Sequence, residues 1–315
     1  MNNIATNSKL AILSISLTIA TGASPSAIAW NECGHKAVAC IAFNNLDANT
    51  KTRAMQILAQ LDKFPEKWSA AAPRGMGKDQ AVFLKSAYWP DEIKRDSEFS
   101  QEDKSDLTAG IAMNDSSDKN RHNSWHYINL MFSSDGSKLP PMPTPNVKTQ
   151  ILQACKILKS NAPDDVKAYS LAWLLHLVGD VHQPLHSVAR VCVASPNGDE
   201  GGGEVVVQPG GSLHSFWDSA YGKETNEKKI AKSISEANWT APPSSSNLDI
   251  DTWINGSVEL AKKDAYREPI GPGNKDGNRP YRLSKDYRAN ATTVADERVK
   301  LAGYRLAGLL NTELK

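Results

Sequence analysis

The apolar positions of the chain recur mostly with helical spacing. Residues 33–46, "CGHKAVACIAFNNL", and residues 49–61, "NTKTRAMQILAQL", both place apolar side chains three and four positions apart, with Asn49 or Thr50 as the N-cap of the second segment. Residues 163–183 give the clearest pattern, with Pro163 at the start, acidic residues in the first turn and Pro184 at the end. Further helices are predicted over residues 147–160, 212–222, 225–238, 249–266 and 291–314.

The remaining segments are irregular or ambiguous. Residues 81–94, "AVFLKSAYWPDEIK", begin as a helix that Pro90 should break. "WHYINLMF", residues 125–132, fits a strand or an extended segment, and "EGGGEVVVQPGG", residues 200–211, fits a short hairpin or a loop with one strand. The expected fold is therefore mainly α: a single globular helical domain with long loops and at most a short hairpin. Loops of such length in a compact domain tend to be functional.

Composition and charge narrow the functional classes. The chain has 315 residues, of which 40% are hydrophobic and 23% charged, which is typical of a globular protein with a sizeable core. The formal net charge is only +1, so no global basic field would collect nucleic acid. An anionic substrate would have to be attracted locally.

The first residues have the pattern of an export signal. Lys9 supplies a positive charge, residues 10–23 are apolar, and "AIA" before Trp30 is a small-x-small cleavage site. We therefore expect residues 1–29 to be a cleaved signal peptide and residues 30–315 to form the mature domain. The mature protein would be secreted or periplasmic and would not be attached to a membrane, because no later segment is long and apolar enough to span one.

Export also permits disulfide bonds. The four cysteines, Cys33, Cys40, Cys155 and Cys192, allow three pairings, between which the sequence does not choose. Zinc ligation by these thiols is disfavoured because they form no C-x-x-C pair. We therefore expect a disulfide-bonded protein.

Histidines are concentrated in one short segment. The chain has seven, and "HLVGDVHQPLH", residues 176–186, holds three of them. His176 and Asp180 are four positions apart, so both project from one face of the predicted helix, and His186 follows the turn at Pro184. His214 and Asp218 repeat the spacing. One such pair is usually a surface hydrogen bond, but two pairs together with His186 favour a zinc site.

Three further residues, His35, Asp91 and His126, would individually be ordinary satisfied polar side chains. Their motifs are "W-x(4)-H" from Trp30, "W-x-D-x-x-K" from Trp89 and "HYIN" from His126, and they precede "H-x(3)-D-x(5)-H" and "LH-x-x-WD". In this order, and over most of the mature chain, the set resembles the zinc-dependent single-strand-specific nucleases of fungi, plants and bacteria. These are the S-one/P-one type nucleases of the phospholipase C/nuclease superfamily.

The resemblance implies a helical domain of the phospholipase C/nuclease type with three zinc ions. Asp91, His126 and His176 match the ligands of the first zinc, and His186, His214 and Asp218 match those of the second. Trp30 would bind the third through its free amine and its carbonyl oxygen, together with His35, and Asp180 would bridge the first and third. His122 and His182 match no ligand position.

The resemblance also implies the reaction. A metal-activated hydroxide would hydrolyse phosphodiester bonds of single-stranded RNA and DNA and leave 5′-phosphates, and 3′-mononucleotides are a further candidate substrate. Asp180 and Lys94 would be catalytic, with Lys94 neutralising charge on the transition state and contacting substrate. Tyr127 would stack on a base, and Asn129 would hydrogen-bond a base edge. The enzyme is expected to be a monomer.

Two other classes stay open. A phospholipase C of the same superfamily typically has Glu at the position of Asp218 and a longer spacing from the terminal Trp to the first His, so both features favour the nuclease. A non-catalytic zinc protein would bind zinc tightly without turnover, but open metal positions are typical of catalytic sites.

The chain departs from the family pattern in one loop. The family has Gly-Gly-Asn where this chain has "GGGE", and Asn before "LH" where this chain has Ser212.

Overall fold

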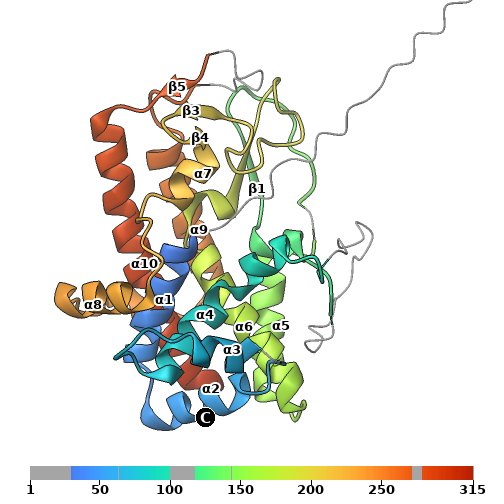
Figure 1. Cartoon of the computed structure of the whole chain (residues 1–315). Coiled ribbons are helices and arrows are strands. Elements are labelled where there is room, and N and C mark those ends of the chain that lie inside the picture. Colours follow the sequence, from blue (N-terminus) through green and yellow to red (C-terminus); the bar gives the residue numbers. More distant parts are fainter. Residues whose placement is uncertain (1–29, 63, 100–117, 143, 272–278, 315) are drawn as a thin grey trace, which may run out of the picture.

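The structure is a computed structural model that describes residues 30–62, 64–99, 118–142, 144–271 and 279–314 (Figure 1). The predicted signal peptide, residues 1–29, lies outside the described residues. Ten α-helices occur among the described residues, which confirms the mainly α prediction. They are α1 (Glu32–Asn44), α2 (Ala48–Leu58), α3 (Phe64–Ala70), α4 (Lys78–Glu92), α5 (Val147–Lys159), α6 (Asp164–Asp180), α7 (Leu213–Asp218), α8 (Glu227–Ala237), α9 (Ile250–Leu260) and α10 (Lys285–Glu313).

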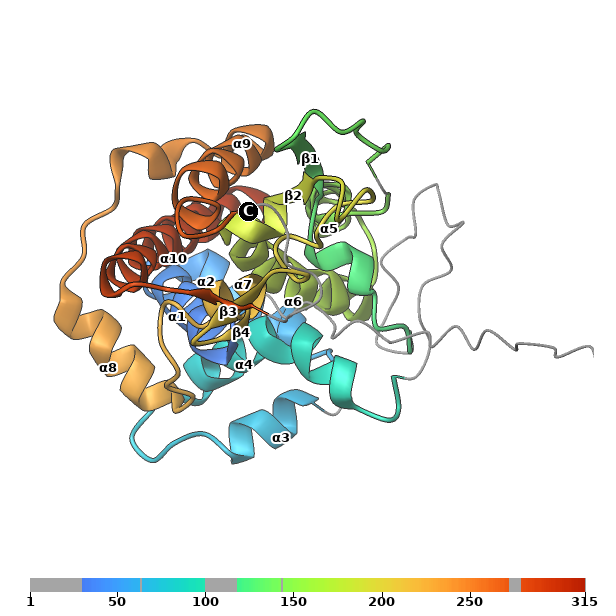
Figure 2. The same ribbon diagram turned by 90° about the horizontal axis from the view of Figure 1, so that it is seen from above.

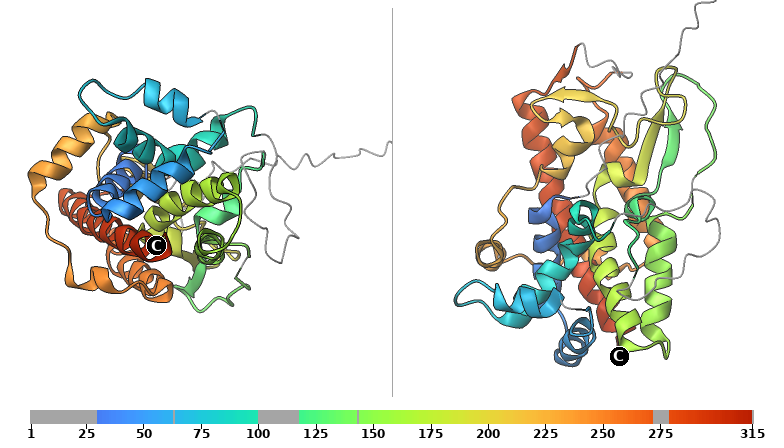
Figure 3. Two further views of the ribbon diagram at one scale, coloured as in Figure 1. Left: turned by 90° about the horizontal axis from the view of Figure 1, so that it is seen from below. Right: turned by 45° about the vertical axis from the view of Figure 1, so that its right-hand side comes forward.

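Helix α6 is the centre of the main core. Every residue from Ala168 to Asp180 is buried, so the helix is enclosed on all sides, as its nearly continuous apolar sequence requires. Helices α1, α2, α4, α5 and α10 pack against it (Figure 2). Seen from below, α1 and the long α10 lie side by side (Figure 3). The carboxyl-terminal end of α6, which carries two candidate ligands, is thereby fixed inside the molecule.

The strands are short and lie near one end of the helical core. Strands β3 (Val206–Gln208) and β4 (Gly211–Ser212) form the predicted hairpin, and β5 (Tyr281–Arg282) joins β3 in parallel. Strand β1 (Leu130–Ser133) pairs in parallel with β2 (Val188–Val191), with Leu130 opposite Val188. The strands are thus more numerous than the single hairpin expected. The parallel pairs join segments that are distant in sequence, and no local pattern announces such pairing.

Several helix boundaries differ from the predictions. Pro90 lies inside α4, which continues to Glu92, so the predicted break is wrong. A proline removes only its own hydrogen bond, and here the helix ends within two residues, so the loss is small. Helix α2 begins at Ala48, with Asp47 as its N-cap and not Asn49 or Thr50, and α10 begins at Lys285, with Ser284 as the N-cap, and not at residue 291.

The expectation of a disulfide bond is wrong in this structure. All four cysteines lie among the described residues, and each has a free thiol. Cys33 and Cys40 are seven positions apart on α1, and two turns of a helix separate such residues by about 10 Å, beyond the reach of a disulfide. Among the described residues, no helix is both long and apolar enough to cross a membrane.

Candidate metal centre

Eight of the nine predicted ligands are buried side chains that come together from six segments. His35 comes from α1, Asp91 from the last turn of α4, and His176 and Asp180 from the end of α6. His126 ends the 3-10 turn Asn123–His126, His186 lies in the 3-10 turn Pro184–Ser187, and His214 and Asp218 lie on α7. They form three groups, and within each group the ligand atoms lie within 4.8 Å of one another. The first is Asp91, His126 and His176, the second is His186, His214 and Asp218, and the third is His35, His176 and Asp180.

The first group contains Asp91, His126 and His176. Nε2 of His176 lies 2.9 Å from Nδ1 of His126 and 3.8 Å from Oδ1 of Asp91. The opposite nitrogen of His176 donates to the carbonyl oxygen of Ala87 at 2.8 Å. That carbonyl lies one turn before Asp91 on α4, next to the helix hydrogen bond that Pro90 removes. The turn containing the proline therefore orients one candidate ligand and carries another.

The second group contains His186, His214 and Asp218. The two Nε2 atoms face each other at 3.0 Å, and Oδ1 of Asp218 lies 3.8 Å from that of His186 and 3.7 Å from that of His214. Both Nδ1 atoms point away, to the carbonyl oxygens of His126 at 2.7 Å and Gly201 at 3.0 Å. This is the orientation that metal-bound histidines usually have.

Asp180 lies between the first group and His35. Its Oδ2 is 3.1 Å from Nδ1 of His126 and 3.2 Å from Nε2 of His176, whereas Oδ1 is 3.3 Å from Nε2 of His35. Gly179 makes room for His35, because a Cβ atom there would lie 2.8 Å from Nδ1 of His35. The two oxygens of Asp180 therefore face two different sets of nitrogen atoms, as a bridging carboxylate would.

Trp30, the ninth predicted ligand, is fully buried at the start of α1. The next residue, Asn31, caps α1 by accepting from the amide of Gly34, and its own amide donates to the carbonyl oxygen of Asp218 at 3.0 Å. This backbone hydrogen bond ties the segment before α1 to α7. Trp30 therefore lies beside the region where the three groups meet.

The donor atoms fit a set of divalent cations. A carbonyl oxygen only accepts, so each histidine that faces one must carry its proton on Nδ1, which leaves a lone pair on Nε2. In the second group, two such lone pairs converge at 3.0 Å beside a carboxylate. Oδ2 of Asp91, Oδ1 of Asp180 and both ring nitrogens of His35 are buried without a hydrogen-bond partner. A cation bound between these atoms would remove the repulsion and satisfy the unpaired acceptors.

The protonation states of the candidate ligands also favour bound cations. Burial lowers the pKa values of His176 and His214 to about 4, so both imidazoles are neutral near pH 7, which is the ligating form. Burial raises the pKa of Asp180 to about 7 and that of Asp218 well above its ordinary range. Burial alone would also raise the pKa of Asp91, but Lys94 and His176 bring it down to about 2. A bound cation would favour the ionised form of all three carboxylates.

The predicted catalytic lysine is part of this centre. Nζ of Lys94 lies 2.9 Å from Oδ1 of Asp91, and its side chain is only 5% exposed, so it is not a solvated surface lysine. Tyr127 follows His126 directly, Asn129 comes two residues later, and both are half-buried. Neither belongs to any of the three groups, and the base-binding roles expected for them remain predictions.

Sequence reasoning missed the residues that orient the ligands. The buried Nε2 of Gln183 donates to Oδ1 of Asp218 at 2.7 Å, although nothing in the pattern of "HLVGDVHQPLH" distinguishes this amide. His122 and His182 lie outside the three groups, as expected. His122 pairs with Asp118 at 3.0 Å, and His182 contacts the carbonyl oxygen of Val178 and the guanidinium of Arg305.

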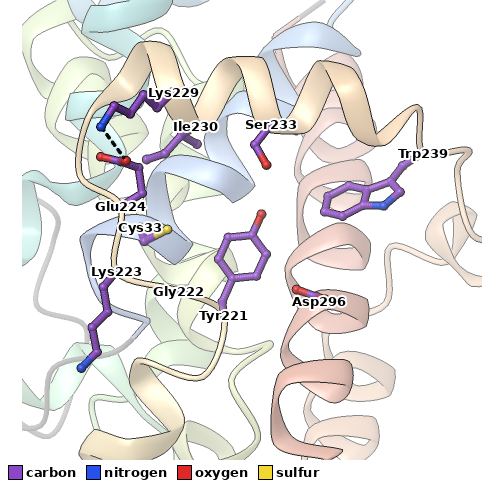
Figure 4. Close-up of a pocket in the computed structure, with 10 residues that line it drawn as sticks. All are labelled: Cys33, Tyr221, Gly222, Lys223, Glu224, Lys229, Ile230, Ser233, Trp239 and Asp296. Carbon is purple, nitrogen blue, oxygen red and sulfur yellow. Dashed lines mark ion pairs between the residues drawn. The ribbon is translucent and has the colours of Figure 1, made fainter. Parts of the chain in front are cut away.

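A cavity of 330 Å³ lies beside the centre but contains none of its ligands (Figure 4). It is bounded by α1, α8, α10 and the segment after α7, and Lys229 pairs with Glu224 at its edge. Asn31 links it to the metal groups, because its Nδ2 donates to the carbonyl oxygen of Gly222 in the cavity wall at 2.6 Å. The cavity is therefore a neighbour of the centre, and none of the eight side-chain ligands lines it.

These features define a helical protein with a buried centre of imidazole and carboxylate ligands able to hold several metal ions. The profile of the S1/P1 nuclease family matches residues 30–315, and the chain belongs to this family. It is therefore a hydrolase of the nuclease type, with nucleic acid as its substrate. The family identification agrees with the resemblance carried by the sequence motifs.

Two curated relatives come from Arabidopsis thaliana. Endonuclease 5 is 24% identical over an alignment of 328 residues that covers 94% of each chain. Endonuclease 4 is 28% identical over 165 residues, which is 45% of this chain and about half, 49%, of that protein. The similarity to the first relative therefore extends over nearly the whole chain, including all the candidate ligands.

Proposed function

We propose that this member of the family is a zinc-dependent endonuclease that hydrolyses single-stranded RNA and DNA to products with 5′-phosphates, with 3′-mononucleotides as a second candidate substrate. The observation that carries the proposal is the convergence of the Nε2 lone pairs of His186 and His214 beside Asp218. Imidazole and carboxylate donors at this separation are the ligands that zinc prefers. The family identification supports the nuclease activity, and the donor set supports the metal.

The ligands divide into three sets. Asp91, His126 and His176 would hold the first zinc, and His186, His214 and Asp218 the second. Trp30 and His35 would hold the third, with Asp180 shared between the first and third sets because its two oxygens face different nitrogen atoms. Bound zinc would supply Lewis acidity that activates water near neutral pH and stabilises negative charge on the phosphate. The protein itself fixes the positions of the donors.

Lys94 is the candidate for a direct contact with the phosphate. Its ammonium group lies 2.9 Å from Oδ1 of Asp91 in a mostly buried position, where charges are weakly screened. A cation held there would stabilise charge that develops on the phosphate oxygens. Lys94 thus concentrates positive charge at the centre of a protein whose net charge is only +1.

Single-strand preference requires a binding surface for unstacked bases. Tyr127 directly follows the ligand His126 in the chain and is half-buried. Aromatic side chains bind bases with little sequence preference, at roughly 1–3 kcal/mol for each base. Asn129, two residues further, would hydrogen-bond a base edge. The position beside the first metal group supports both assignments.

Two alternatives differ in substrate or turnover. A phospholipase C would hydrolyse phosphatidylcholine and leave RNA intact, and a non-catalytic zinc protein would turn over neither. Metal analysis of the mature protein, together with assays on single-stranded RNA, single-stranded DNA, duplex DNA and phosphatidylcholine vesicles, separates the three. We expect zinc, faster cleavage of single strands and 5′-phosphate ends. Full activity after exhaustive chelation, with no zinc detected, would refute the metal assignment.

Location and assembly state belong to the same proposal. The pattern of residues 1–29 supports export followed by cleavage before Trp30, which gives a secreted or periplasmic protein. We also propose a monomer, since all eight side-chain ligands come from one chain. Amino-terminal sequencing of the exported protein and its sedimentation in solution test the two points.

A further inference from the structure

The ligand His214 is oriented by a glycine-rich loop between β2 and β3. Nδ1 of His214 donates to the carbonyl oxygen of Gly201 at 3.0 Å, and Gly201 has a positive φ of 60°. A Cβ atom on Gly201 would lie 2.3 Å from the carbonyl oxygen of Leu185, the residue before His186, and 3.2 Å from Nδ1 of His214. The loop therefore passes tightly between the segments that carry two ligands of one metal group, and only glycine fits there.

A buried carboxylate fixes this loop. Asp199 is 1% exposed, and its Oδ1 accepts from the backbone amides of Arg190 at 2.9 Å and Gly202 at 3.1 Å and from the hydroxyl of Tyr266 at 2.9 Å. Its backbone also bonds on both sides, from its amide to the carbonyl of Arg190 and from the amide of Glu204 to its own carbonyl. One side chain thus joins β2, the loop and the π-helical turn Ala261–Ala265, which Tyr266 follows.

Arg190 makes further contacts around the carboxylate of Asp199. Nε of Arg190 lies 3.5 Å from Oδ2 of Asp199, its Nη1 donates to the carbonyl oxygen of Gly271 at 2.8 Å, and its guanidinium lies over the ring of Tyr266 at 4.6 Å. Charged groups are costly to bury, so a buried carboxylate is stable only where several groups bind it in a defined geometry. Here one oxygen of Asp199 accepts from three donors. The geometry that it holds is that of Gly201 and Gly202.

We propose that Asp199 is a positioning residue for the metal group His186, His214 and Asp218. It holds the amide of Gly202, which sets the direction of the preceding Gly201 carbonyl, and that carbonyl fixes the tautomer and ring orientation of His214. The inference rests on the proposed metal function and deepens it. In the same loop, where this chain has "GGGE" and the family has Gly-Gly-Asn, Glu204 accepts from the hydroxyl of Ser195 at 2.5 Å.

The effect of Asp199 is selective. His176, in the first metal group, is oriented by the carbonyl of Ala87 on α4, and His35 lies against Asp180 at the end of α6. Neither contact involves the loop. Without the carboxylate of Asp199, the amides of Arg190 and Gly202 lose their acceptor, the loop relaxes and His214 can rotate or exchange its proton between ring nitrogens. One metal group should weaken while the other two keep their ligands.

The test compares Asp199→Ala and Asp199→Asn with Asp135→Ala as the matched control. Asp135 also accepts from backbone amides, those of Ser137 at 3.1 Å and Val193 at 2.8 Å, but it is exposed and outside the metal groups. Zinc titration of the metal-free full-length mature protein should show one site weakened about 10- to 100-fold in Asp199→Ala. Asp199→Asn, which keeps an acceptor oxygen, should recover part of that loss, and Asp135→Ala should match the unsubstituted protein.

A second measurement needs no metal. Nitrogen-15 spectra of the histidine rings in the metal-free protein, assigned with His214→Asn, should show His214 as the Nδ1–H tautomer, and as a mixture of tautomers in Asp199→Ala. An unchanged tautomer in Asp199→Ala, or an equal weakening of all three zinc sites, would overturn the inference. If the unsubstituted protein bound no zinc, the proposed function would fail, and the ring spectra would still decide the role of Asp199.

Discussion

Asp180 differs from Asp218 because its two oxygens face different sets of histidine nitrogens. Oδ2 lies near His126 and His176, and Oδ1 lies near His35, each at about 3.1 to 3.3 Å. Asp218 in contrast faces only the second group, and Gln183 holds the same oxygen. The two carboxylates therefore have different roles although each is four positions after a histidine.

We expect Asp180→Asn to lower turnover more than Asp218→Asn. An amide oxygen is a weaker and neutral ligand, so the first substitution affects two metal sets and the second affects one. Steady-state turnover and zinc content of both variants give the comparison. Equal and small losses would show that Asp180 does not bridge.

In the metal-free protein, Asp180→Asn should stabilise the folded state at alkaline pH. Burial raises the pKa of Asp180 from 3.8 to about 7, so the ionised carboxylate destabilises the folded state at pH 8 but only slightly at pH 4, where it is protonated in the folded state and partly protonated in the unfolded state. Asp180→Asn should therefore raise the free energy of unfolding at pH 8, by up to about 4 kcal/mol. Urea denaturation of chelated samples at pH 8 and pH 4 measures it, and a gain that persists at pH 4 would point to another cause.

Tyr127→Ala should weaken binding of single-stranded substrate by about 1–3 kcal/mol and leave the zinc content unchanged. The reason is that Tyr127 adjoins His126 but belongs to no metal group. Binding measured with a noncleavable oligonucleotide, together with metal analysis, gives both quantities. Tyr127→Phe, which keeps the ring, is the control, and loss of metal before loss of binding would show that Tyr127 supports the ligands instead.

The motifs pointed to the candidate ligands more directly than to the groups that support them. The nine candidate positions come from motifs that resemble those of the family, and eight of them are side chains that the structure brings together in three groups. The groups that orient them are backbone carbonyls, such as those of Ala87 and Gly201, or distant side chains such as Asp199. Every residue has a carbonyl, and the pairing of Asp199 with Tyr266 depends on tertiary packing, so neither leaves a local signal.

At the scale of elements, the start of α1 is the part of the fold that cleavage before Trp30 would affect. Trp30 is fully buried, and Asn31 ties the helix start to both Asp218 and Gly222. In a chain cut before Trp30, the terminal nitrogen is an amine and can donate a lone pair to zinc. In an extended chain the same nitrogen is an amide, whose lone pair is delocalised into the peptide bond.

We therefore expect a protein with a few extra residues before Trp30 to bind about one zinc fewer and to turn over much more slowly than the mature form. The side-chain ligands of the other two sets are the same in both. Metal content and turnover of the two purified forms provide the comparison. Identical values would exclude a role for the terminal amine.

Apolar periodicity predicted the existence of every α-helix except α3, whereas the helix boundaries depended on packing. Pro90 reads as a helix breaker, yet α4 continues through it, because Trp89 and Asp91 on either side are buried and held by the core. Helix α10 begins at Lys285, since Ser284 accepts from the amide of Tyr287 and caps it, although the residues that follow are polar. The strand pairings were not predictable in this way, because β1 and β2 meet only in the folded chain.

For the whole molecule, removal of the metal should make the stability of the folded state sensitive to acid. All five histidines of the three groups have pKa values lowered by burial, to about 4 for His176 and His214, so below pH 6.5 the unfolded chain binds more protons than the folded one. The stability of the metal-free protein should then fall as the pH drops from about 6.5 to about 4, by up to about 1.4 kcal/mol per pH unit for each histidine. Asp180 and Asp218 act in the opposite direction but are fewer.

Thermal unfolding of chelated and zinc-loaded protein between pH 4 and pH 8 measures this coupling. The zinc-loaded form should have the higher Tm at pH 7, because a ligand that binds only the folded state stabilises it. The difference should vanish near the acid end, where protonated histidines release the metal. Parallel curves over the whole range would contradict the coupling.

The contact between the first and the last long helices has a consequence for the timing of folding. Helix α1, which carries His35, packs along α10, which ends at Glu313, so the packing of α1 is complete only after the end of the chain has been synthesised. Contacts between such distant segments slow folding. The full support of His35 is therefore in place only in the finished chain, and the three groups of ligands are complete only where that chain folds.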